Sequence, residues 1–274
     1  MKKKTPSKTV LVTGGSSGIG RSIALALHRE GYVVYVGARR INRTENLKTR
    51  GLRPLELDVT NDASMQSAVK KIKQESGTID ILVNCAGFGL YGAIEDTPMA
   101  DAREQMEVNL FGLARMTQLV LPLMRSQLSG KIINISSVGG KITTPLGGWY
   151  HTSKFAVEGL SDSLRNEVKQ LGIDVIIVEP GGVKTEGRDA AMRYLMRVSD
   201  QSAYGNLAVK VLKLYTSPMN RIAEPQVVGD LVARIVKAKN PRPRYASGRL
   251  RWAILTRRFM SDRAYDRMIA ILLK

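Results

Sequence analysis

Short apolar runs alternate with amphipathic stretches along most of the chain. Runs rich in valine and isoleucine predict six strands, over residues 9–15, 32–38, 52–59, 79–87, 131–137 and 173–182. Apolar residues at helical spacing between these runs predict helices over residues 16–31, 42–50, 62–76, 101–127 and 150–171. Strands that are apolar throughout and alternate with helices favour a parallel sheet that helices cover on both faces. Right-handed crossovers then predict a doubly wound α/β sheet, the Rossmann fold.

The last third of the chain departs from this alternation. Residues 186–220 have no strand pattern, so we expect helices outside the sheet, where they could form a lid over a ligand cleft. Residues 224–239 predict one more helix, and residues 242–248 a short last strand. We therefore expect one Rossmann-fold domain over residues 1–248, followed by a basic, apolar helical extension over 249–274.

Composition limits the classes of function that remain. The 274 residues suit one sizeable domain, and no apolar run approaches the ~18 residues of a membrane span. Cys85 is the single cysteine, which excludes an intrachain disulfide and favours a reducing, cytoplasmic compartment. His28 and His151 are the only histidines, which argues against a zinc site or a histidine-based triad.

The charge is strongly positive and unevenly placed. The formal net charge is +18, and residues 237–274 hold eleven lysines and arginines against two acids, Asp262 and Asp266. Such a balance favours anionic partners, namely phosphate ligands, anionic lipid or nucleic acid. Aromatic residues make up only 5% of the chain and nucleic-acid-binding signatures are absent, so nucleic acid is the weakest of these candidates.

A glycine-rich segment, TGGSSGIG at residues 13–20, joins the first predicted strand to the first helix. Its glycines permit a tight turn and let the backbone approach a ligand. The start of the helix offers free N–H groups and a partial positive charge to a pyrophosphate. This position between strand and helix favours a dinucleotide site over a purely structural turn. The predicted contacts are Gly14, Ser16, Ser17, Gly18, Ile19 and Gly20.

The second predicted strand ends in GARR, without an acidic residue. An acid at this position binds the ribose hydroxyls of NAD, whereas an arginine accepts the 2′-phosphate of NADP. Guanidinium groups bind phosphate through charge-assisted hydrogen bonds. We therefore predict NADP(H) as the cofactor, held by Arg39 and Arg40; the alternative is that both arginines are simply solvated.

Tyr150 and Lys154 stand four residues apart in the stretch GWYHTSKFAVEG. In a helix of about 3.6 residues per turn, these side chains share one face. A free phenol, with a pKa of about 10, is a weak base at neutral pH, and a nearby ammonium stabilises its ionised form. The pair can therefore move a proton to or from a bound oxygen, although the spacing alone also fits a chance surface pair.

Together these motifs resemble the short-chain dehydrogenase/reductase family. The matching segments, in family order, are TGGSSGIG, Asp58-Val59, NCAG at residues 84–87, Asn109, ISS before Val138, YHTSK from Tyr150, and PGGVKT at residues 180–185. They span about residues 8–185, and beyond this range the resemblance supports little. The resemblance implies a nicotinamide-dependent oxidoreductase.

The resemblance also implies a role for each matching residue. Tyr150 would be the acid/base, and Lys154 would bind the nicotinamide ribose and lower the pKa of the phenol. Ser137 would hydrogen-bond the substrate oxygen, and Asn109 would hold a water that relays protons from Lys154. The implied cofactor contacts comprise Asp58 and Val59 at the adenine, Asn84 near the adenosine ribose, Val183 and Thr185 at the carboxamide, and also Ala86, Gly87, Tyr150, Lys154, Pro180 and Gly181.

Two positions near these motifs are expected to carry no chemistry. Cys85 stands where the family commonly has an asparagine, and we expect a small packed residue rather than a nucleophile. His151 faces about 100° away from its neighbour Tyr150 on a helix, so we expect it at the helix surface or at a subunit interface.

The sequence thus predicts transfer of a hydride between NADP(H) and an apolar ketone, aldehyde or secondary alcohol. Steroid-, retinoid- or acyl-chain-like substrates rest on analogy alone, and a 3-oxoacyl-type reductase is one alternative. A non-catalytic NADP-binding sensor or interaction protein is another, against which stands the intact set of Asn109, Ser137, Tyr150 and Lys154. Family members are commonly dimers or tetramers, so we expect a homo-oligomer.

The tail over residues 250–274 mixes bulky apolar residues with arginines. One interpretation places its helices over the substrate cleft or against a partner subunit. The other is an interfacial helix, whose apolar side enters a membrane surface while arginines meet anionic headgroups. We expect a cytoplasmic protein whose contact with a membrane, if present, is peripheral.

Overall fold

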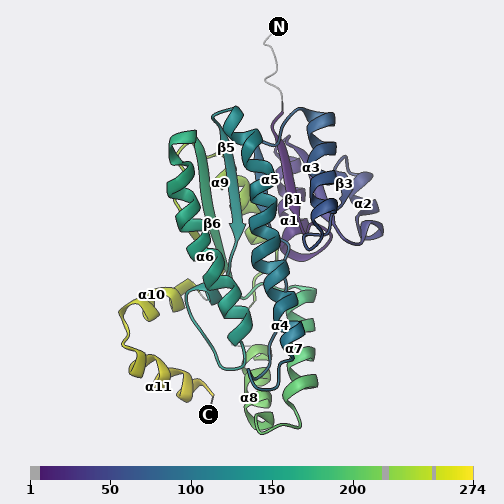
Figure 1. Cartoon of the computed structure of the whole chain (residues 1–274). Coiled ribbons are helices and arrows are strands. Elements are labelled where there is room, and N and C mark those ends of the chain that lie inside the picture. Colours follow the sequence, from purple (N-terminus) through teal and green to yellow (C-terminus); the bar gives the residue numbers. More distant parts are fainter. Residues whose placement is uncertain (1–6, 218–221, 249–250, 274) are drawn as a thin grey trace.

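The structure is a computed structural model that describes residues 7–217, 222–248 and 251–273. These residues form a parallel sheet of seven strands in the order β3-β2-β1-β4-β5-β6-β7 (Figure 1). The strands are β1 (Thr9–Thr13), β2 (Val33–Ala38), β3 (Arg53–Glu56), β4 (Ile81–Asn84), β5 (Gly130–Ile135), β6 (Ile173–Gly181) and β7 (Arg244–Gly248). The predicted doubly wound Rossmann fold is confirmed, including its short last strand.

Helices connect the strands and extend beyond them. They are α1 (Gly18–Arg29), η1 (Ile41–Thr44), α2 (Glu45–Lys48), α3 (Asp62–Ser76), α4 (Met99–Met106), η2 (Glu107–Phe111), α5 (Gly112–Ser126), η3 (Val138–Gly140), α6 (Gly148–Val168), η4 (Lys169–Leu171), α7 (Glu186–Ser199), α8 (Gly205–Thr216), α9 (Gln226–Lys237), α10 (Arg251–Phe259) and α11 (Asp262–Leu272). The helix predicted over residues 42–50 is two short pieces, η1 and α2.

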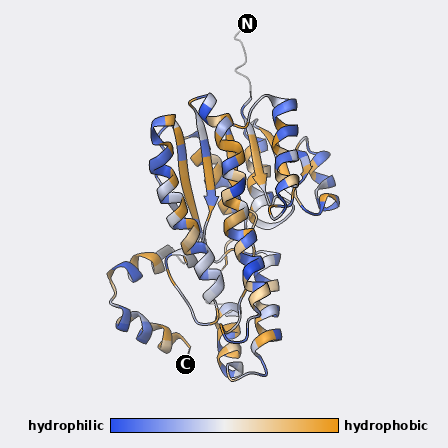
Figure 2. Cartoon of the chain, in the orientation of Figure 1, coloured by the Kyte–Doolittle hydropathy of each residue, from blue (hydrophilic) through white to orange (hydrophobic). Residues whose placement is uncertain are grey.

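Two hydrophobic clusters hold the layers together, one on each face of the sheet. Val10 and Val12 pack with α1 and α9 on one face, whereas Leu11 packs with α3 and α5 on the other. This alternation follows from the two-residue period of side chains along a strand. Figure 2 shows that the strands are apolar and that the outer helices mix apolar and polar residues. The strands read as continuous apolar runs because both faces of the sheet are buried.

The helix predicted over residues 101–127 is one continuous helical stretch with a π-helical segment, η2, between α4 and α5. Such π segments are rare and occur frequently at functional sites. η2 contains Asn109, and Gly112 follows it at a point of close packing, where a Cβ would lie 2.5 Å from the carbonyl oxygen of Val59. The sequence predicted the length of this helix but not the change in its winding.

The expected lid segment forms α7 and α8, and residues 218–220 at its end lie outside the described residues. A third hydrophobic cluster joins these two helices to Tyr91, Leu146 and Leu273. The helical extension is present as α10 and α11, while its expected boundary after Gly248 adjoins residues 249–250, which are not described. Within the described ranges, no helix combines the length and the apolar character needed to cross a membrane.

Candidate active site

A cavity of about 690 Å³ opens at the carboxyl edge of the sheet. Its walls come from the loop after β1, the end of β2, the loop after β4 and one side of α7. Ligands of open α/β sheets bind at this edge, next to the point where the strand order reverses, which here lies between β1 and β4. The predicted cofactor residues that line the cavity are Gly14, Ser16, Ser17, Arg39, Arg40, Val59, Ala86 and Gly87.

The glycine loop has a backbone that only glycine accommodates readily. Gly14 and Gly18 have φ values of +66° and +52°, in the left-handed region. A Cβ on Gly14 would lie 2.7 Å from the Cα of Ala86. Thr13 Oγ1 fixes the neighbouring loop by accepting hydrogen bonds from the N–H groups of Cys85 at 3.0 Å and Ala86 at 3.1 Å. The loop thus presents backbone to the cavity ahead of α1, which fits a pyrophosphate.

Arg39 and Arg40 lie at the carboxyl end of β2, where both are exposed and line the cavity. Neither forms an ion pair within the described part of the chain. Arg43, one turn further, is instead paired with Glu186 of α7 at 3.0 Å. The two arginines of the GARR segment therefore keep their charge available for an anion bound beside β2.

The predicted catalytic residues come together where β5 and β6 end and α6 begins. Lys154 Nζ donates a hydrogen bond to the carbonyl oxygen of Ile135 at 2.9 Å. The Ser137 hydroxyl donates to the carbonyl oxygen of Pro180 at 3.4 Å and is hydrogen-bonded to Tyr150. α6 carries Tyr150 and Lys154 one turn apart, so the serine, phenol and ammonium occupy one region.

Burial raises the pKa of Tyr150 to about 12, against the opposing effect of the hydrogen bond with Ser137 and with a small addition from Tyr215. Desolvation of the phenol is the largest influence on this pKa, and the predicted lowering by Lys154 stays a prediction. Tyr150 is consequently protonated at neutral pH. A protonated phenol is suited to donate its proton to a developing alkoxide.

Lys154 is itself buried, and burial lowers its pKa to about 8, while Cys85 and Glu158 act in the opposite direction. Most of the lysine therefore remains an ammonium at neutral pH. Burial also raises the pKa of the Cys85 thiol to about 12, so Cys85 is not a thiolate nucleophile. Cys85 packs against the hydrophobic cluster beneath the glycine loop, as expected for a small packed residue.

Asn109 is almost completely buried, and its side chain is fully engaged. Its Oδ1 accepts from the N–H of Phe88 at 3.0 Å, and its Nδ2 donates to the carbonyl of Phe88 at 2.9 Å and to Ser153 Oγ at 3.0 Å. The amide therefore ties the loop after β4 to the first turns of α6. The expected water-holding role of Asn109 stays a prediction.

His151 is only 4% exposed, so the prediction of a surface or interface position is wrong. Its Nδ1 is 3.0 Å from the carbonyl oxygen of Gly139, and its Nε2 accepts from the N–H of Thr144 at 3.0 Å. Burial lowers its pKa, which favours the neutral ring. The helical spacing was read correctly, but the loop between η3 and α6 folds over that face. His151 thereby braces the segment that leads into Tyr150.

A buried group of charges lies on the far side of Lys154. Glu158 follows Lys154 by one turn, and its Oε2 pairs with Lys141 at 2.8 Å and with Arg244 at 3.0 Å. Glu179 of β6 lies 3.7 Å from the same arginine. Burial, reinforced by Glu158, raises the pKa of Glu179 to about 7. In the sequence, Glu158 and Glu179 are simply two acids near the motifs, and no local pattern indicates that they are buried together.

Two other predicted cofactor residues have local structural partners. The Asp58 carboxylate accepts hydrogen bonds from the N–H of Thr60 at 2.9 Å and from its hydroxyl at 2.8 Å. The Asn84 side chain is buried and donates to Thr117 at 3.1 Å and Asn134 at 2.9 Å. Neither side chain lines the cavity, so their contacts with adenine and ribose stay predictions.

The PGGVKT segment meets the glycine loop. Thr185 caps α7 by accepting from the N–H of Arg188 at 3.2 Å, and its methyl group would lie 3.2 Å from a Cβ on Gly18. Val183 is buried and forms a β-bridge with Ala223. The predicted contacts that remain lie at the end of β6 and in the first turn of α1: Pro180, Gly181, Ile19 and Gly20. Their contacts with a cofactor stay predictions.

An aromatic wall stands next to Tyr150. The ring of Tyr91 is centred 5.7 Å from the ring of Tyr150, and its hydroxyl is hydrogen-bonded to that of Tyr215 in α8. Leu146 and Met192 belong to the same cluster. The sequence motifs did not indicate Tyr215, because α8 lies beyond them and nothing in its own pattern shows which way it folds back.

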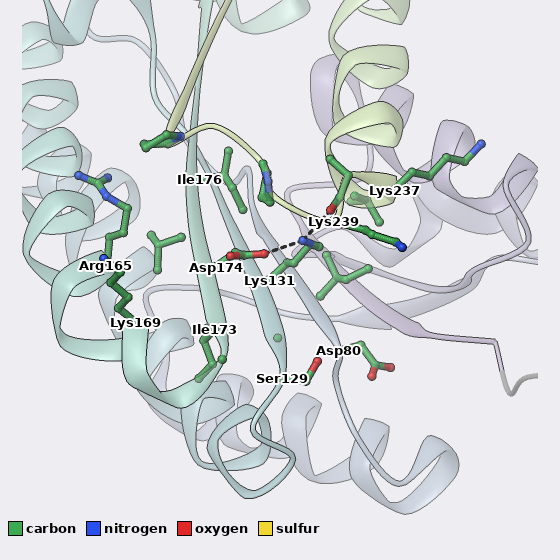
Figure 3. Close-up of a pocket in the computed structure, with 18 of the residues that line it drawn as sticks. Asp80, Ser129, Lys131, Arg165, Lys169, Ile173, Asp174, Ile176, Lys237 and Lys239 are labelled. Atoms are coloured by element: carbon green, nitrogen blue, oxygen red, sulfur yellow. Dashed lines mark hydrogen bonds and ion pairs between the residues drawn. The ribbon is translucent and has the colours of Figure 1, made fainter.

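A second cavity, of about 680 Å³, lies at the amino edge of the sheet (Figure 3). Its polar lining consists mainly of Lys8, Asp80, Ser129, Lys131, Arg165, Asn166, Lys169, Asp174, Lys237 and Lys239. Lys131 and Asp174 point toward one another and pair at 2.6 Å, whereas Lys237 points away from them. None of the predicted site residues lines this cavity.

Comparison with known proteins agrees with this geometry. The sequence model of the short chain dehydrogenase family matches residues 8–193. The chain belongs to the short-chain dehydrogenase/reductase family. It is 39% identical over 233 residues to a 3-ketodihydrosphingosine reductase of Bacteroides thetaiotaomicron. The aligned region covers 85% of this chain and 84% of that protein.

Solved structures of the family superpose over most of the chain. A short-chain dehydrogenase from Streptomyces avermitilis matches with a TM-score of 0.82 and 30% identity, over 98% of this chain and 96% of that one. The aldohexose dehydrogenase of Thermoplasma acidophilum matches with a TM-score of 0.70 and 33% identity, over 83% of this chain and 86% of that one. The protein is therefore an oxidoreductase of a family that binds NAD(H) or NADP(H) and acts on small molecules.

Proposed function

We propose that this enzyme transfers a hydride between NADP(H) and an apolar, long-chain ketone or the corresponding secondary alcohol. The observation that carries the proposal is that Ser137, Tyr150 and Lys154 lie together, largely shielded from water, beside an apolar wall. The cofactor would supply the hydride to the carbonyl carbon, and the protein would supply the proton and hold the oxygen.

The preference for NADP rests on the end of β2. Arg39 and Arg40 line the cavity, are exposed and carry no paired carboxylate in the described residues, so a 2′-phosphate would meet two free guanidinium groups. An acid that would favour NAD is absent from the GARR segment. Glu186, the α7 carboxylate that lines the cavity, is already engaged by Arg43.

The acid–base chemistry belongs to three side chains. Ser137 would donate a hydrogen bond to the substrate oxygen, and Tyr150 would transfer its phenolic proton to that oxygen. Because burial raises the pKa of Tyr150 to about 12, the proton is present at neutral pH and is available to the substrate oxygen. The Lys154 ammonium, one turn away, would stabilise the phenolate that remains.

The substrate class follows from the wall beside Tyr150. Tyr91, Leu146, Met192 and Leu195 form a buried apolar cluster there, so the surroundings of the phenol favour an apolar substrate over a polar one. The similar reductase of Bacteroides thetaiotaomicron acts on a ketone of this kind, as its name states. The similar aldohexose dehydrogenase has a sugar substrate by its name, and an apolar wall is unsuited to a polyol. The same wall would accept a 3-oxoacyl chain.

We also propose a homo-oligomer in the cytoplasm, peripheral to the membrane. Phe111 of η2 and Phe155 of α6 are 54% and 44% exposed on adjoining elements. Exposed aromatic side chains on two adjoining elements favour association of subunits through this face.

The test is a screen of NADPH oxidation over ketones of increasing chain length, with a sugar aldehyde as the polar control. Each methylene buried against the wall contributes about 0.8 kcal/mol, so kcat/KM is expected to rise about fourfold per methylene until the wall is covered. Equal kcat/KM for short ketones, long ketones and the sugar aldehyde would contradict the proposed substrate class.

A further inference from the structure

The extension carries an apolar stripe on α10 that faces solvent. Trp252, Leu255 and Phe259 are 62%, 49% and 84% exposed. Their spacing of three and four residues places them on one face of the helix. Figure 1 shows α10 and α11 beside the end of α6, and α10 contacts the sheet at β6 and β7. Bulky apolar side chains clustered in this way mark an interaction surface.

The other helix of the extension is fastened to the enzyme. Tyr265 of α11 is buried, and its hydroxyl donates to the carbonyl oxygen of Thr143 at 2.5 Å. Arg257 joins the two helices by pairing with Asp262 at 2.6 Å and lying over the ring of Tyr265 at 4.9 Å. The exposed stripe therefore belongs to a braced pair of helices rather than to a loose end.

The same pair of helices adjoins the substrate wall. Leu273 and Ile269 of the extension pack in the hydrophobic cluster that contains Leu146 and Tyr150. Thr143, which holds Tyr265, lies in the loop that leads from η3 into α6. A partner that binds the extension would therefore lie next to the apolar cluster around Tyr150.

Cations accompany the apolar stripe. Arg258 lies beside Leu255 around α10, and Arg263 and Arg267 follow one another at a spacing of four residues on α11. All three are exposed, and among the residues that the structure describes none of them has an ion-pair or hydrogen-bond partner. The face opposite Tyr265 is therefore cationic, next to exposed aromatic and aliphatic side chains.

We propose that α10 and α11 dock the enzyme on an anionic lipid bilayer. The α10 stripe would enter the acyl boundary, and the three arginines would meet phosphate-bearing headgroups. A bilayer fits both halves of this surface, whereas a second copy that paired through the same surface would bring its own Arg258, Arg263 and Arg267 against these cations. Docking here would place the cleft at the membrane, where a long-chain ketone dissolves, and that last step rests on the proposed function.

Sedimentation of the full-length protein with vesicles tests the docking without any assay of activity. We expect it to bind mixed phosphatidylglycerol/phosphatidylcholine vesicles at low salt and to bind pure phosphatidylcholine vesicles far more weakly. Failure to bind the mixed vesicles overturns the proposal. Association that appears without vesicles, seen as a Phe259-dependent dimer in light scattering, would instead assign the stripe to a second copy and also overturns it.

Two variants locate the binding surface. Phe259→Glu should lower the partition coefficient at least about tenfold, since a buried phenylalanine contributes about 1.5–3 kcal/mol. Arg263→Gln combined with Arg267→Gln should lower it about thirtyfold, at about 1 kcal/mol for each cation near an anionic surface.

Each variant has a matched control elsewhere on the molecule. Leu128→Glu places a carboxylate at another exposed apolar position, and Lys169→Gln with Lys239→Gln removes two cations from the amino-edge cavity. Both controls should keep binding within about twofold, a difference well below 1 kcal/mol. Controls that weaken binding as much as the α10 and α11 variants would show an undirected attraction of charge and overturn the proposal. Oxidation of NADPH with a soluble short ketone, measured on the same samples, shows separately whether the proposed function fails.

Discussion

The carboxyl-edge and amino-edge cavities have nearly the same volume, about 690 Å³ and 680 Å³, but they are built differently. The carboxyl-edge cavity is lined by the exposed Arg39 and Arg40. Beside Gly87 of its lining, however, two polar groups are buried and held: Lys154 on the Ile135 carbonyl and Asn109 on the Phe88 backbone. At the amino edge, Lys169 and Lys239 are exposed and have no partner among the described residues.

The difference separates the proposed active site from a cavity that is only charged. Groups that are already fixed need not be ordered during the reaction, and a site shielded from water strengthens their electrostatic effect. An exposed lysine must lose considerable side-chain freedom before it holds a ligand in one position. Volume and exposed cations are similar in the two cavities, whereas the buried, hydrogen-bonded groups beside Gly87 distinguish the carboxyl edge.

The largest effect should come from removing the proton at the carboxyl edge. Tyr150→Phe keeps the ring that packs beside Tyr91 but removes the hydroxyl, so turnover should fall at least about 100-fold while NADPH still binds. Steady-state turnover and fluorescence titration of NADPH measure the two quantities. Tyr245→Phe, which removes a hydroxyl that accepts from the N–H of Arg242, is the matched control and should leave turnover unchanged. Normal turnover in a folded Tyr150→Phe protein would remove the basis of the proposed mechanism.

The second effect concerns the buried charges behind Lys154. The Glu179 carboxyl has a pKa of about 7 in the fold against 4.5 as its ordinary value, so between these values the folded state binds more protons than the unfolded state. Its contribution to the free energy of unfolding is therefore full below pH 4.5 and is lost as the pH rises through 7. From about pH 5 to about pH 8 this loss should be on the order of 2 kcal/mol.

Glu179→Gln should flatten that dependence, because the amide does not titrate. Urea unfolding at the two pH values measures it, and Glu224→Gln, at a carboxylate that is 70% exposed, is the control that should leave the slope as it is. If the free energy of unfolding falls equally in the variant and in the unmodified protein between the two pH values, the proton is not bound by Glu179.

The smallest effect is expected from removing one unpaired cation from each cavity and comparing the preference for NADPH over NADH. Arg39→Ala should reduce the preference for NADPH over NADH about tenfold or more, since a charge-assisted hydrogen bond contributes about 1.5–3 kcal/mol. Lys169→Ala removes a free cation from the amino-edge cavity and should leave the preference unchanged. The ratio of kcat/KM for the two cofactors is the measurement. Equal kcat/KM values for NADPH and NADH in the unmodified enzyme would refute the NADP assignment.

The motifs predicted the fold well because they depend on local geometry. Two-residue and 3.6-residue periods identify strands and helices without knowledge of their partners, and the parallel sheet follows from continuous apolar strands. Gly14 and Gly18 were recognisable because a left-handed backbone restricts the residue type at those positions. The four-residue spacing likewise placed Tyr150 and Lys154 on one face of α6.

Other properties of the site depend on residues that are distant in the sequence. His151 was assigned to the wrong environment because its burial comes from the loop that folds over α6. Tyr215 is part of the site because α8 returns to Tyr91, which no local pattern encodes. The π-helical winding at Asn109 accompanies contacts with the loop after β4 and with α6.

The sequence by itself determined the element order, the glycine loop, the acid-free end of β2 and the four-residue spacing of Tyr150 and Lys154, the proposed acid–base pair. Each of these is a matter of residue type at a fixed local spacing. The tertiary structure alone decided the protonation of that pair, because a pKa depends on how much water and which charges surround the group. Burial raises the pKa of Tyr150 to about 12 and lowers that of Lys154 to about 8. Chain segments more than a hundred residues apart create that burial, since Tyr91 beside Tyr150 packs with Tyr215 and with the extension.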